Sequence, residues 1–345
     1  MNRSTRCSRP SRTPGPRSSD PRRGRAASAG GATPHSPSTR RYPVSATLPR
    51  TPRRIGAARR LEPYAYVAPT AALMIVLMLV PIAMVIGYSF LDNVILNKDP
   101  EVVGLDNYIE VITDPVFGTA IANTLVFVTA SVAAHLLIGL AFAMMLNSRL
   151  LGPRVLAAFR GIFILPWLFT AAIVAVLWRM LLSPNGVVNY LLGALGFGDG
   201  TTEWLSDPGL ALGSVTFINI WSGYPFFMIS LLAGLQGIPA DLYEAAKVDG
   251  AGPIQRFWNV TIPQLKPIII SMALLDFIWT SQQFALIWMT TGGGPIVATE
   301  MLSTYTYKLA FAKYEFALAS TSAVLILLLS MVLAVLYVRH QRARD

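Results

Sequence analysis

The sequence predicts an all-α, polytopic membrane protein in which six helices cross the bilayer. Of the 345 residues, 53% are hydrophobic and only 13% are charged, about half the charged share of an ordinary soluble domain. Six separate runs stay apolar for about 20 residues, the length that crosses ~30 Å of hydrocarbon. Lys and Arg gather in alternate connecting segments, as they do when a chain threads back and forth across a membrane.

The six predicted spans cover residues 66–90, 120–146, 155–182, 210–235, 267–288 and 316–338. Pro81, Pro166 and Pro225 fall inside them and should kink the helices, which a bundle tolerates where neighbouring groups satisfy the freed carbonyls. Residues 63–345 therefore form one predicted transmembrane domain.

The distribution of positive charge predicts the orientation. The N-terminal tail, residues 147–160, residues 237–266 and the residues after 338 hold 24 of the 28 Lys and Arg residues. The three other connections hold four, together with 11 acidic residues. Because cytoplasmic segments retain Lys and Arg, both termini and residues 237–266 are predicted to face the cytoplasm from the plasma membrane.

The net charge of +10 belongs to the N-terminal tail. Residues 1–61 contain 15 Arg and one acid, Asp20, so the tail carries +14 and the rest of the chain about −4. The tail lacks hydrophobic periodicity, so residues 1–62 are predicted to be disordered and cytoplasmic. It either contacts anionic lipid headgroups, or is solvated topogenic chain, or lies upstream of the natural start. Its Arg clusters lack interleaved aromatic residues, which argues against nucleic-acid binding.

Metal and nucleotide chemistry are not indicated. Cys7 is the single cysteine, and His35, His135 and His340 lie far apart without metal-ligand spacing. His135 is predicted to be a packed residue between helices. None of the five lysines follows a glycine, so the chain has no G-x-x-x-x-G-K-[ST] phosphate loop. We expect no cofactor and no enzymatic activity.

The cytoplasmic segment GIPADLYEAAKVDGAGPIQRFWNVTIPQLKP predicts two short surface helices joined by a glycine turn. Asp241 and Glu244 have the spacing of a capping box, which starts the first helix. Gly250 supplies the left-handed residue that ends it. Pro253 suits the first turn of the second helix, and Pro263 is expected to break that helix.

The first of these helices has a narrow apolar face made by Leu242, Ala245 and Ala246. Small side chains let a helix approach a partner closely, but alanine is also simply a good helix former, so these residues alone leave both interpretations open. The pattern Glu-Ala-Ala, three residues, Gly, nine residues and then Val-Thr-Ile-Pro is similar to the EAA loop of binding-protein-dependent ABC importers. Val and Ile replace the Ile and Leu of that pattern.

The resemblance extends to the maltose-type sugar permease family over about residues 64–339, on the segments WSGYPF, LQGIPADLYEAAKVDGAGP, TTGGGPIVATE and TYTYKLAF. It implies the transmembrane domain of a type I ABC importer of carbohydrates, with an EAA coupling helix in a coupling loop at residues 239–263. The implied partners are a second permease subunit, two ATP-binding subunits on the cytoplasmic face and an extracytoplasmic solute-binding protein. Contact with the ATPase is implied for Glu244, Ala245, Ala246, Asp249 and Gly250.

Asp276 is the only acidic residue inside a predicted span, and an intramembrane carboxylate is costly enough to indicate a functional site. Polar and aromatic side chains share its helix face and one face of the preceding span, a combination that suits the hydroxyls and apolar faces of a sugar. The resemblance implies a sugar site at the matching positions, namely Asn219, Ser222, Gly223, Phe226, Asp276, Trp279, Thr280 and Gln283. Alternatively, Asp276 and Gln283 hydrogen-bond across helices and hold the bundle together.

Two features are predicted to have other roles. The tryptophans Trp167, Trp178, Trp204 and Trp221 suit interfacial anchors. The glycine-rich segment TTGGGP is expected to form a tight turn outside the membrane, near the contact with a binding protein.

Two alternatives stay open at the level of function. A polyol or glycerol-phosphate-type solute is the second substrate class, although a phosphate would require Arg or Lys, and residues 210–235 and 267–288 contain neither. An ion-coupled secondary transporter would also explain six spans and an intramembrane Asp276. It offers no reason for the coupling loop.

Overall fold

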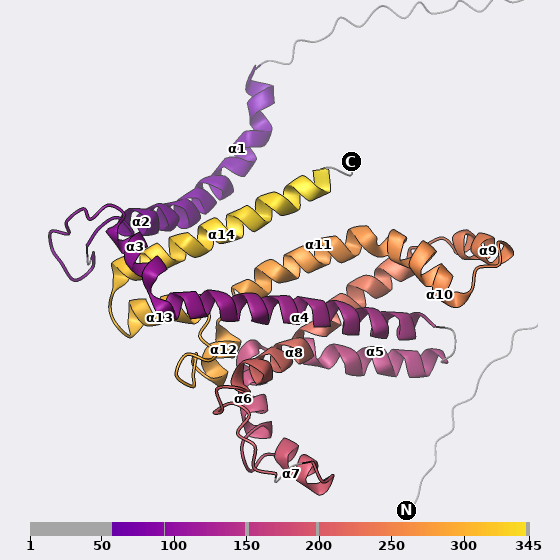
Figure 1. The fold of residues 1–345 in the computed structure, drawn as a ribbon. Coiled ribbons are helices and arrows are strands. Elements are labelled where there is room, and N and C mark those ends of the chain that lie inside the picture. Colours follow the sequence, from indigo (N-terminus) through magenta and orange to yellow (C-terminus); the bar gives the residue numbers. More distant parts are fainter. Residues whose placement is uncertain (1–56, 93, 149–151, 198–199, 343–345) are drawn as a thin grey trace, which may run out of the picture. The chain divides into compact units, whose positions relative to one another are not determined.

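The computed structural model describes residues 57–92, 94–148, 152–197 and 200–342 (Figure 1). They form helices, apart from one antiparallel bridge between Leu91 and Val102 and the connecting turns. Most of the tail predicted to be disordered lies outside the described residues. Its end differs from the prediction, because α1 begins at Ala57 and residues 57–62 are helical. The chain divides after Glu62, and the part from Pro63 onward, called the second unit, is described below.

Two π-helical turns allow prolines to sit within long helices. One run consists of α1 (Ala57–Met74), η1 (Ile75–Leu79) and α2 (Val80–Tyr88), and the other of α10 (Pro253–Arg256), η2 (Phe257–Thr261) and α11 (Ile262–Ser281). Pro81 and Pro263 each lie two residues after the π turn. Proline lacks an N–H and clashes with the carbonyl four residues earlier, and a wider turn accommodates both. The prediction that Pro263 breaks the helix is therefore wrong, since the chain is helical from Pro253 to Ser281.

The predicted third span is not one continuous helix. It consists of α5 (Pro153–Leu168) and α6 (Ala171–Leu181), which meet at an angle of 97°. Phe169 and Thr170 between them have extended backbone, and the Thr170 hydroxyl accepts from the Ile173 N–H at 3.5 Å to cap α6. Pro166 lies two residues before the end of α5 and lacks the N–H that would bond the carbonyl four residues earlier, which weakens this end of the helix.

The remaining helices are α3 (Asp106–Thr113), α4 (Pro115–Asn147), α7 (Val187–Ala194), α8 (Ala211–Gln236), α9 (Ala240–Val248), α12 (Ala285–Thr290), α13 (Leu302–Phe311) and α14 (Phe316–Arg342). In the described part of the chain, four helices are long and apolar enough to cross a membrane: Tyr66–Tyr88, Pro115–Asn147, Ala211–Gln236 and Pro253–Ser281. The bent pair α5–α6 brings this number to as many as five, and α14 adds the shorter apolar stretch Phe316–Val332.

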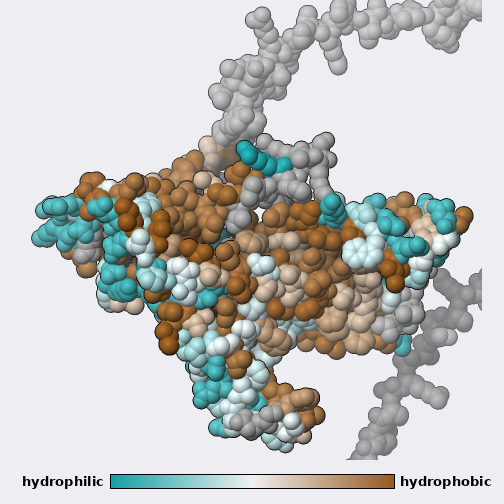
Figure 2. All heavy atoms as spheres, viewed as in Figure 1, coloured by the Kyte–Doolittle hydropathy of each residue, from teal (hydrophilic) through white to brown (hydrophobic). Residues whose placement is uncertain are grey.

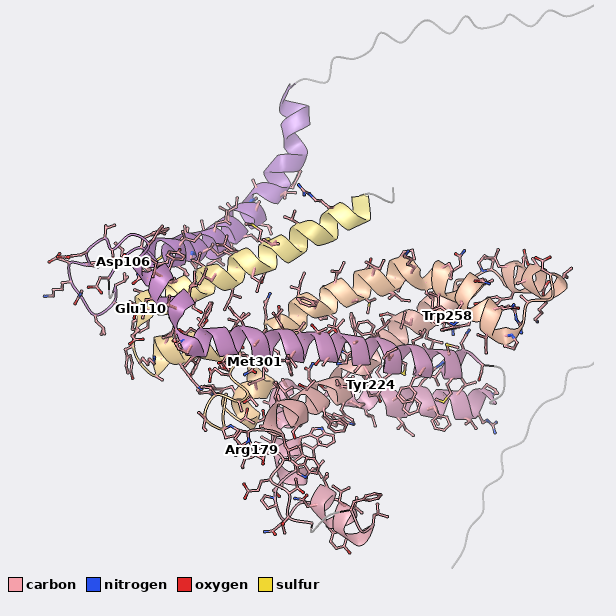
Figure 3. All side chains as sticks on the ribbon, in the orientation of Figure 1. Asp106, Glu110, Arg179, Tyr224, Trp258 and Met301 are labelled. Carbon is pink, nitrogen blue, oxygen red and sulfur yellow. The ribbon has the colours of Figure 1, made fainter. Side chains whose placement is uncertain are left out.

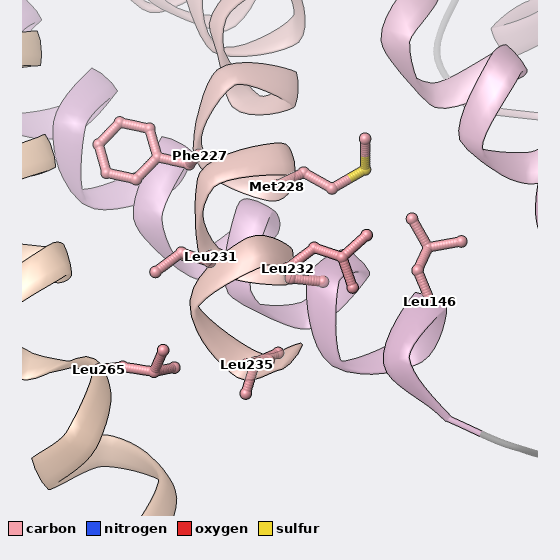
Figure 4. Packing of buried hydrophobic residues seen from close by; sticks show 8 residues of the cluster. Leu146, Phe227, Met228, Leu231, Leu232, Leu235 and Leu265 are labelled. Atoms are coloured by element: carbon pink, nitrogen blue, oxygen red, sulfur yellow. The ribbon is translucent and has the colours of Figure 1, made fainter. Parts of the chain in front are cut away.

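The core forms where α4, α8 and α11 pack against one another. Figure 4 shows the side chains of α8 that meet Leu146 of α4 and Leu265 of α11, namely Phe227, Met228, Leu231, Leu232 and Leu235. The close approach of α4 to α8 depends on Gly139, because a Cβ there would lie 2.9 Å from the Met228 backbone nitrogen. This packing fixes the faces of α4, α8 and α11 that form the site described next.

Hydrophilic residues gather at the ends of the second unit, and a hydrophobic surface lies between them (Figure 2). Trp258 lies at one end, beside α9 and α10, and Asp106 and Glu110 of α3 lie at the other (Figure 3). The segment expected to be cytoplasmic and the acidic connection expected to be outside are thus at opposite ends.

Candidate functional site

A cavity of about 230 Å³ lies among α4, α5, α6, α8 and α11. It brings together seven of the eight residues predicted to contact a sugar, namely Asn219, Ser222, Gly223, Asp276, Trp279, Thr280 and Gln283. Phe226, the eighth, packs behind this wall, with its ring centroid 6.1 Å from that of Trp167 and 5.5 Å from that of Trp279. The two helix faces deduced from residue spacing therefore meet at one place.

Interrupted helices border this cavity. Phe169 and Ala171 line it at the 97° break between α5 and α6. Gln283 lines it in the short non-helical segment between α11 and α12. Within a membrane protein, irregular backbone is tolerated where it lines a cavity, because the exposed peptide groups then find polar partners there. These breaks place Phe169 and Gln283 at the cavity.

A buried pair of ionisable residues forms the wall of the cavity on α4 and α11. Nδ1 of His135 lies 2.8 Å from Oδ2 of Asp276, and Nε2 of the same ring lies 3.1 Å from the Asn219 carbonyl oxygen. His135 is 1% and Asp276 8% exposed. The Thr280 hydroxyl donates to Oδ1 of Asp276 at 3.2 Å. His135 thus lies between helices as predicted, and Asp276 both bonds across helices and faces the cavity.

Gly223 provides the space for His135. A Cβ at Gly223 would collide with the imidazole ring, so this glycine lets the ring lie directly against α8. One turn earlier on α8, Asn219 is 4% exposed, and its side-chain amide nitrogen has no hydrogen-bond partner among the described residues. A buried donor without a partner is costly, and Asn219 lines the cavity.

Aromatic rings form another part of the wall. Trp167 and Trp279 line the cavity and are 47% and 56% exposed. The sequence predicted Trp167 to be an interfacial anchor, whereas the structure places it in the cavity wall. Its position beside a helix break could not be deduced from residue spacing. Trp178 and Trp221 pack against each other elsewhere, with ring centroids 5.4 Å apart.

The EAA segment forms the first of the two expected short helices, α9, at the end of the second unit, whereas the second continues without a break into α11. Gly250 has φ +78°, and a Schellman motif ends α9: the Gly250 N–H donates to the Lys247 carbonyl at 3.0 Å and the Ala251 N–H to the Ala246 carbonyl at 2.9 Å. The capping-box prediction for Asp241 is wrong. α9 begins at Ala240 without a side-chain cap. Asp241 lies in its first turn, where a negative charge interacts favourably with the helix dipole.

α9 is exposed and is attached to the long helix behind it. None of its residues is buried, and Glu244 and Ala245 are exposed. Val248 is 88% exposed. The Tyr243 hydroxyl lies 3.0 Å from the Thr261 hydroxyl in η2.

The glycine-rich segment after α12 is held by a buried network that the sequence did not reveal. Glu300 is 1% exposed, pairs with Lys308 and accepts from the Thr304 hydroxyl at 2.9 Å. The Asn123 amide donates to the carbonyls of Val297, Ala298 and Glu300. The segment is a turn, as predicted, and it is fixed to α4 and α13.

Metal-binding groups are lacking in the described part of the chain, where no three His, Cys, Asp or Glu side chains lie close enough together to hold an ion.

Residues 112–344 match the family described as "Binding-protein-dependent transport system inner membrane component". The chain belongs to this family. Its members are permease components of ABC transporters, which are not catalytic and work with a separate ATPase subunit. This protein is accordingly a multi-pass membrane permease and not an enzyme.

Named relatives of this permease differ in their solutes. The trehalose/maltose transport system permease protein MalF of Thermococcus litoralis is 33% identical over 81% of this chain and 94% of its own length. The sn-glycerol-3-phosphate transport system permease protein UgpA of Yersinia pestis is 30% identical over 84% of this chain and 97% of its own. The relatives thus cover both of the substrate classes considered from the sequence.

Solved structures show the same fold. A chain of a bacterial ABC transporter that imports the acidic polysaccharide alginate superimposes with a TM-score of 0.72 at 25% identity, covering 84% of this permease and 97% of that chain. A structure of a bacterial alginate transporter in complex with an alginate-bound periplasmic protein gives a TM-score of 0.70 at 24% identity, over 81% and 93%. The resemblance to importer permeases that the sequence suggested is confirmed.

Proposed function

We propose that this permease is one of two membrane subunits of an ATP-driven importer that carries a carbohydrate into the cytoplasm. The observation that carries the proposal is the cavity at Asp276. It joins hydrogen-bonding groups of α8 and α11 to exposed aromatic rings of α5 and α11. Sugars need both, because their hydroxyls require fixed donors and acceptors and their C–H faces stack on rings.

The composition of the cavity supports a neutral sugar over a phosphate ester. No Lys or Arg is among its lining residues, and phosphate recognition relies on such groups. The similarity to UgpA supports the alternative, a glycerol-phosphate-type solute. The cavity residues support the trehalose/maltose side of the family.

The proposed topology has six spans: α1–α2, α4, the bent pair α5–α6, α8, α10–α11 and α14. The 27 residues of α14 are long enough to cross at 1.5 Å per residue. With both termini in the cytoplasm, α9 also faces the cytoplasm, and the acidic side chains of α3 face outside. The excess of Lys and Arg on the α9 side supports this orientation.

In this proposal α9 is the coupling helix. Glu244, Ala245 and Ala246 contact the ATPase, and Asp249 and Gly250 set the direction in which the chain returns to α11. ATP is bound by two partner subunits, and this chain needs no cofactor. A solute-binding protein delivers the sugar from outside, and a second permease completes the path.

Reconstitution tests the proposal. The permease, its partner permease, the ATPase subunits and the solute-binding protein are placed in proteoliposomes and offered maltose, trehalose, other neutral saccharides and sn-glycerol 3-phosphate. We expect uptake of a saccharide that requires both ATP and the binding protein. Uptake driven by a proton gradient without ATP would support a secondary transporter instead, and uptake of sn-glycerol 3-phosphate alone would contradict the carbohydrate assignment.

A further inference from the structure

The ring of His135 has two partners that restrict where its protons lie. Nε2 faces the Asn219 carbonyl oxygen at 3.1 Å, and a carbonyl only accepts. Nε2 must therefore carry a proton, because an unprotonated nitrogen there would face the oxygen lone pair to lone pair. Nδ1 faces Oδ2 of Asp276 at 2.8 Å.

A second proton must lie between Nδ1 and Oδ2. It resides either on Nδ1, as an imidazolium facing a carboxylate, or on Oδ2, as an acid donating to a neutral imidazole. The net charge of the pair is zero in both arrangements. Without this proton, two lone pairs would face each other at hydrogen-bond distance in a buried place.

No other charged side chain lines this cavity. Asp276 alone would make it anionic, and His135 removes that charge. Both carboxylate oxygens have a partner: Oδ2 faces Nδ1 of His135, and Oδ1 accepts from the Thr280 hydroxyl at 3.2 Å. Asn219, whose carbonyl holds the ring, has its own amide nitrogen buried and without a partner among the described residues.

We propose that His135 is a positioning residue and a determinant of specificity for the solute site. It acts through Asp276, whose charge it neutralises and whose orientation it fixes. His135 and Asp276 act as one net-neutral unit that leaves the cavity suited to an uncharged, hydroxyl-rich solute. The collision that a Cβ at Gly223 would make with the ring means that α8 is shaped around this unit. The inference rests on the proposed role of the cavity as the solute site.

Four importers are compared in ATP-loaded proteoliposomes with the solute-binding protein: wild type, His135→Leu, Asp276→Asn and the double variant. The probe is the saccharide of the panel that the wild type carries fastest, or sn-glycerol 3-phosphate if it carries no saccharide. Half-saturation concentration, maximal uptake and ATPase rate are measured together. Ser131→Ala, alone and with Asp276→Asn, is the matched control, since Ser131 is buried one turn earlier on α4 and does not line the cavity.

His135→Leu leaves a buried carboxylate without its partner, so we expect at least about a tenfold rise in half-saturation concentration, or loss of assembly. Asp276→Asn should raise the half-saturation concentration by a smaller factor than His135→Leu does. The double variant should assemble and come within about threefold of Asp276→Asn, because partners in one unit are not additive. Ser131→Ala should leave the half-saturation concentration unchanged both in the wild type and in Asp276→Asn.

The inference would be overturned if the factor by which the double variant raises the half-saturation concentration equals the product of the factors of the two single variants. It would also be overturned if the double variant, like His135→Leu, fails to assemble. Wild-type uptake of no saccharide would overturn the carbohydrate assignment but not the pair, which is judged from the comparison among variants.

Discussion

The hydroxyl of Tyr243 on α9 lies 3.0 Å from the hydroxyl of Thr261 in the π-helical turn that leads into α11. This hydrogen bond joins the exposed helix to the long helix that carries Asp276 toward the cavity. In the proposed importer, it helps α9 and α11 to move as one body when the ATPase closes.

Tyr243→Phe removes this bond and little else. A hydrogen bond contributes about 0.5–1.5 kcal/mol, so solute carried per ATP hydrolysed should fall about two- to tenfold while the permease still assembles. Tyr190→Phe is the control, because Tyr190 lies on α7 and is 73% exposed. An unchanged transport-to-ATPase ratio in Tyr243→Phe would show that the bond does not transmit motion.

Gly250 and Gly252 allow backbone strain to be separated from the loss of glycine as such. Gly250 has φ +78° with no atom within 4 Å of a Cβ, so a side chain there meets backbone strain alone. Gly252 has φ −68° and suits an L-residue. Gly250→Val should cost at least about 1–2 kcal/mol locally and reduce ATPase binding in pull-down, as Glu244→Lys should through its charge. Gly252→Ala should bind normally. Equal binding by all three variants would contradict the docking role of α9.

Gly139 tests the contact of α4 with α8. Its Cβ would meet the Met228 backbone nitrogen at 2.9 Å, and backbone cannot move aside. Gly139→Ala should lower the unfolding free energy by about 1–3 kcal/mol. Gly118→Ala on the same helix has open space around it and should be neutral or slightly stabilising. Thermal unfolding of the purified permease measures both, and equal midpoints would contradict the packing.

Trp167 and Trp279 test the aromatic wall. Each substitution by alanine should raise the half-saturation concentration for the carbohydrate about two- to tenfold, since aromatic contacts contribute about 0.5–1.5 kcal/mol beyond area burial. Phe217→Ala is the control, because Phe217 lies on α8, is 51% exposed and packs against Trp178 away from this cavity. A larger effect in the control than in either tryptophan variant would place the solute elsewhere.

Patterns within a short stretch of sequence predicted the helices and the EAA turn, but they did not predict contacts between residues far apart in the chain. Hydropathy locates a helix such as α8, and the left-handed preference of glycine locates Gly250. The break at Phe169 was missed because residues 161–178 are uncharged throughout, and Pro166 also fits a kinked but continuous helix. Pro263 was assigned as a helix end because a π-helical turn has no sequence signal as strong as that of the proline itself.

The candidate site shows the same division. The spacing of Asp276, Thr280 and Gln283 indicated one helix face, and the structure places that face on a cavity. The pairing of His135 with Asp276 joins residues 141 positions apart, and periodicity within one helix carries no information about such a pair. Gly223 was predicted to contact the solute, yet its clearest role is to make room for the His135 ring.

ATP-driven uptake by Asp276→Asn and Gln283→Ala variants in proteoliposomes, with ATPase rate measured in the same samples, tests most directly whether a carbohydrate passes through this cavity. Gln282→Ala is the matched control, since Gln282 is the exposed neighbour and does not line the cavity. We predict that both cavity variants lose about fivefold or more in uptake at low solute, as expected when a hydrogen-bonding partner is removed, while basal ATPase and the control stay unchanged. Wild-type uptake in both cavity variants would contradict the assignment.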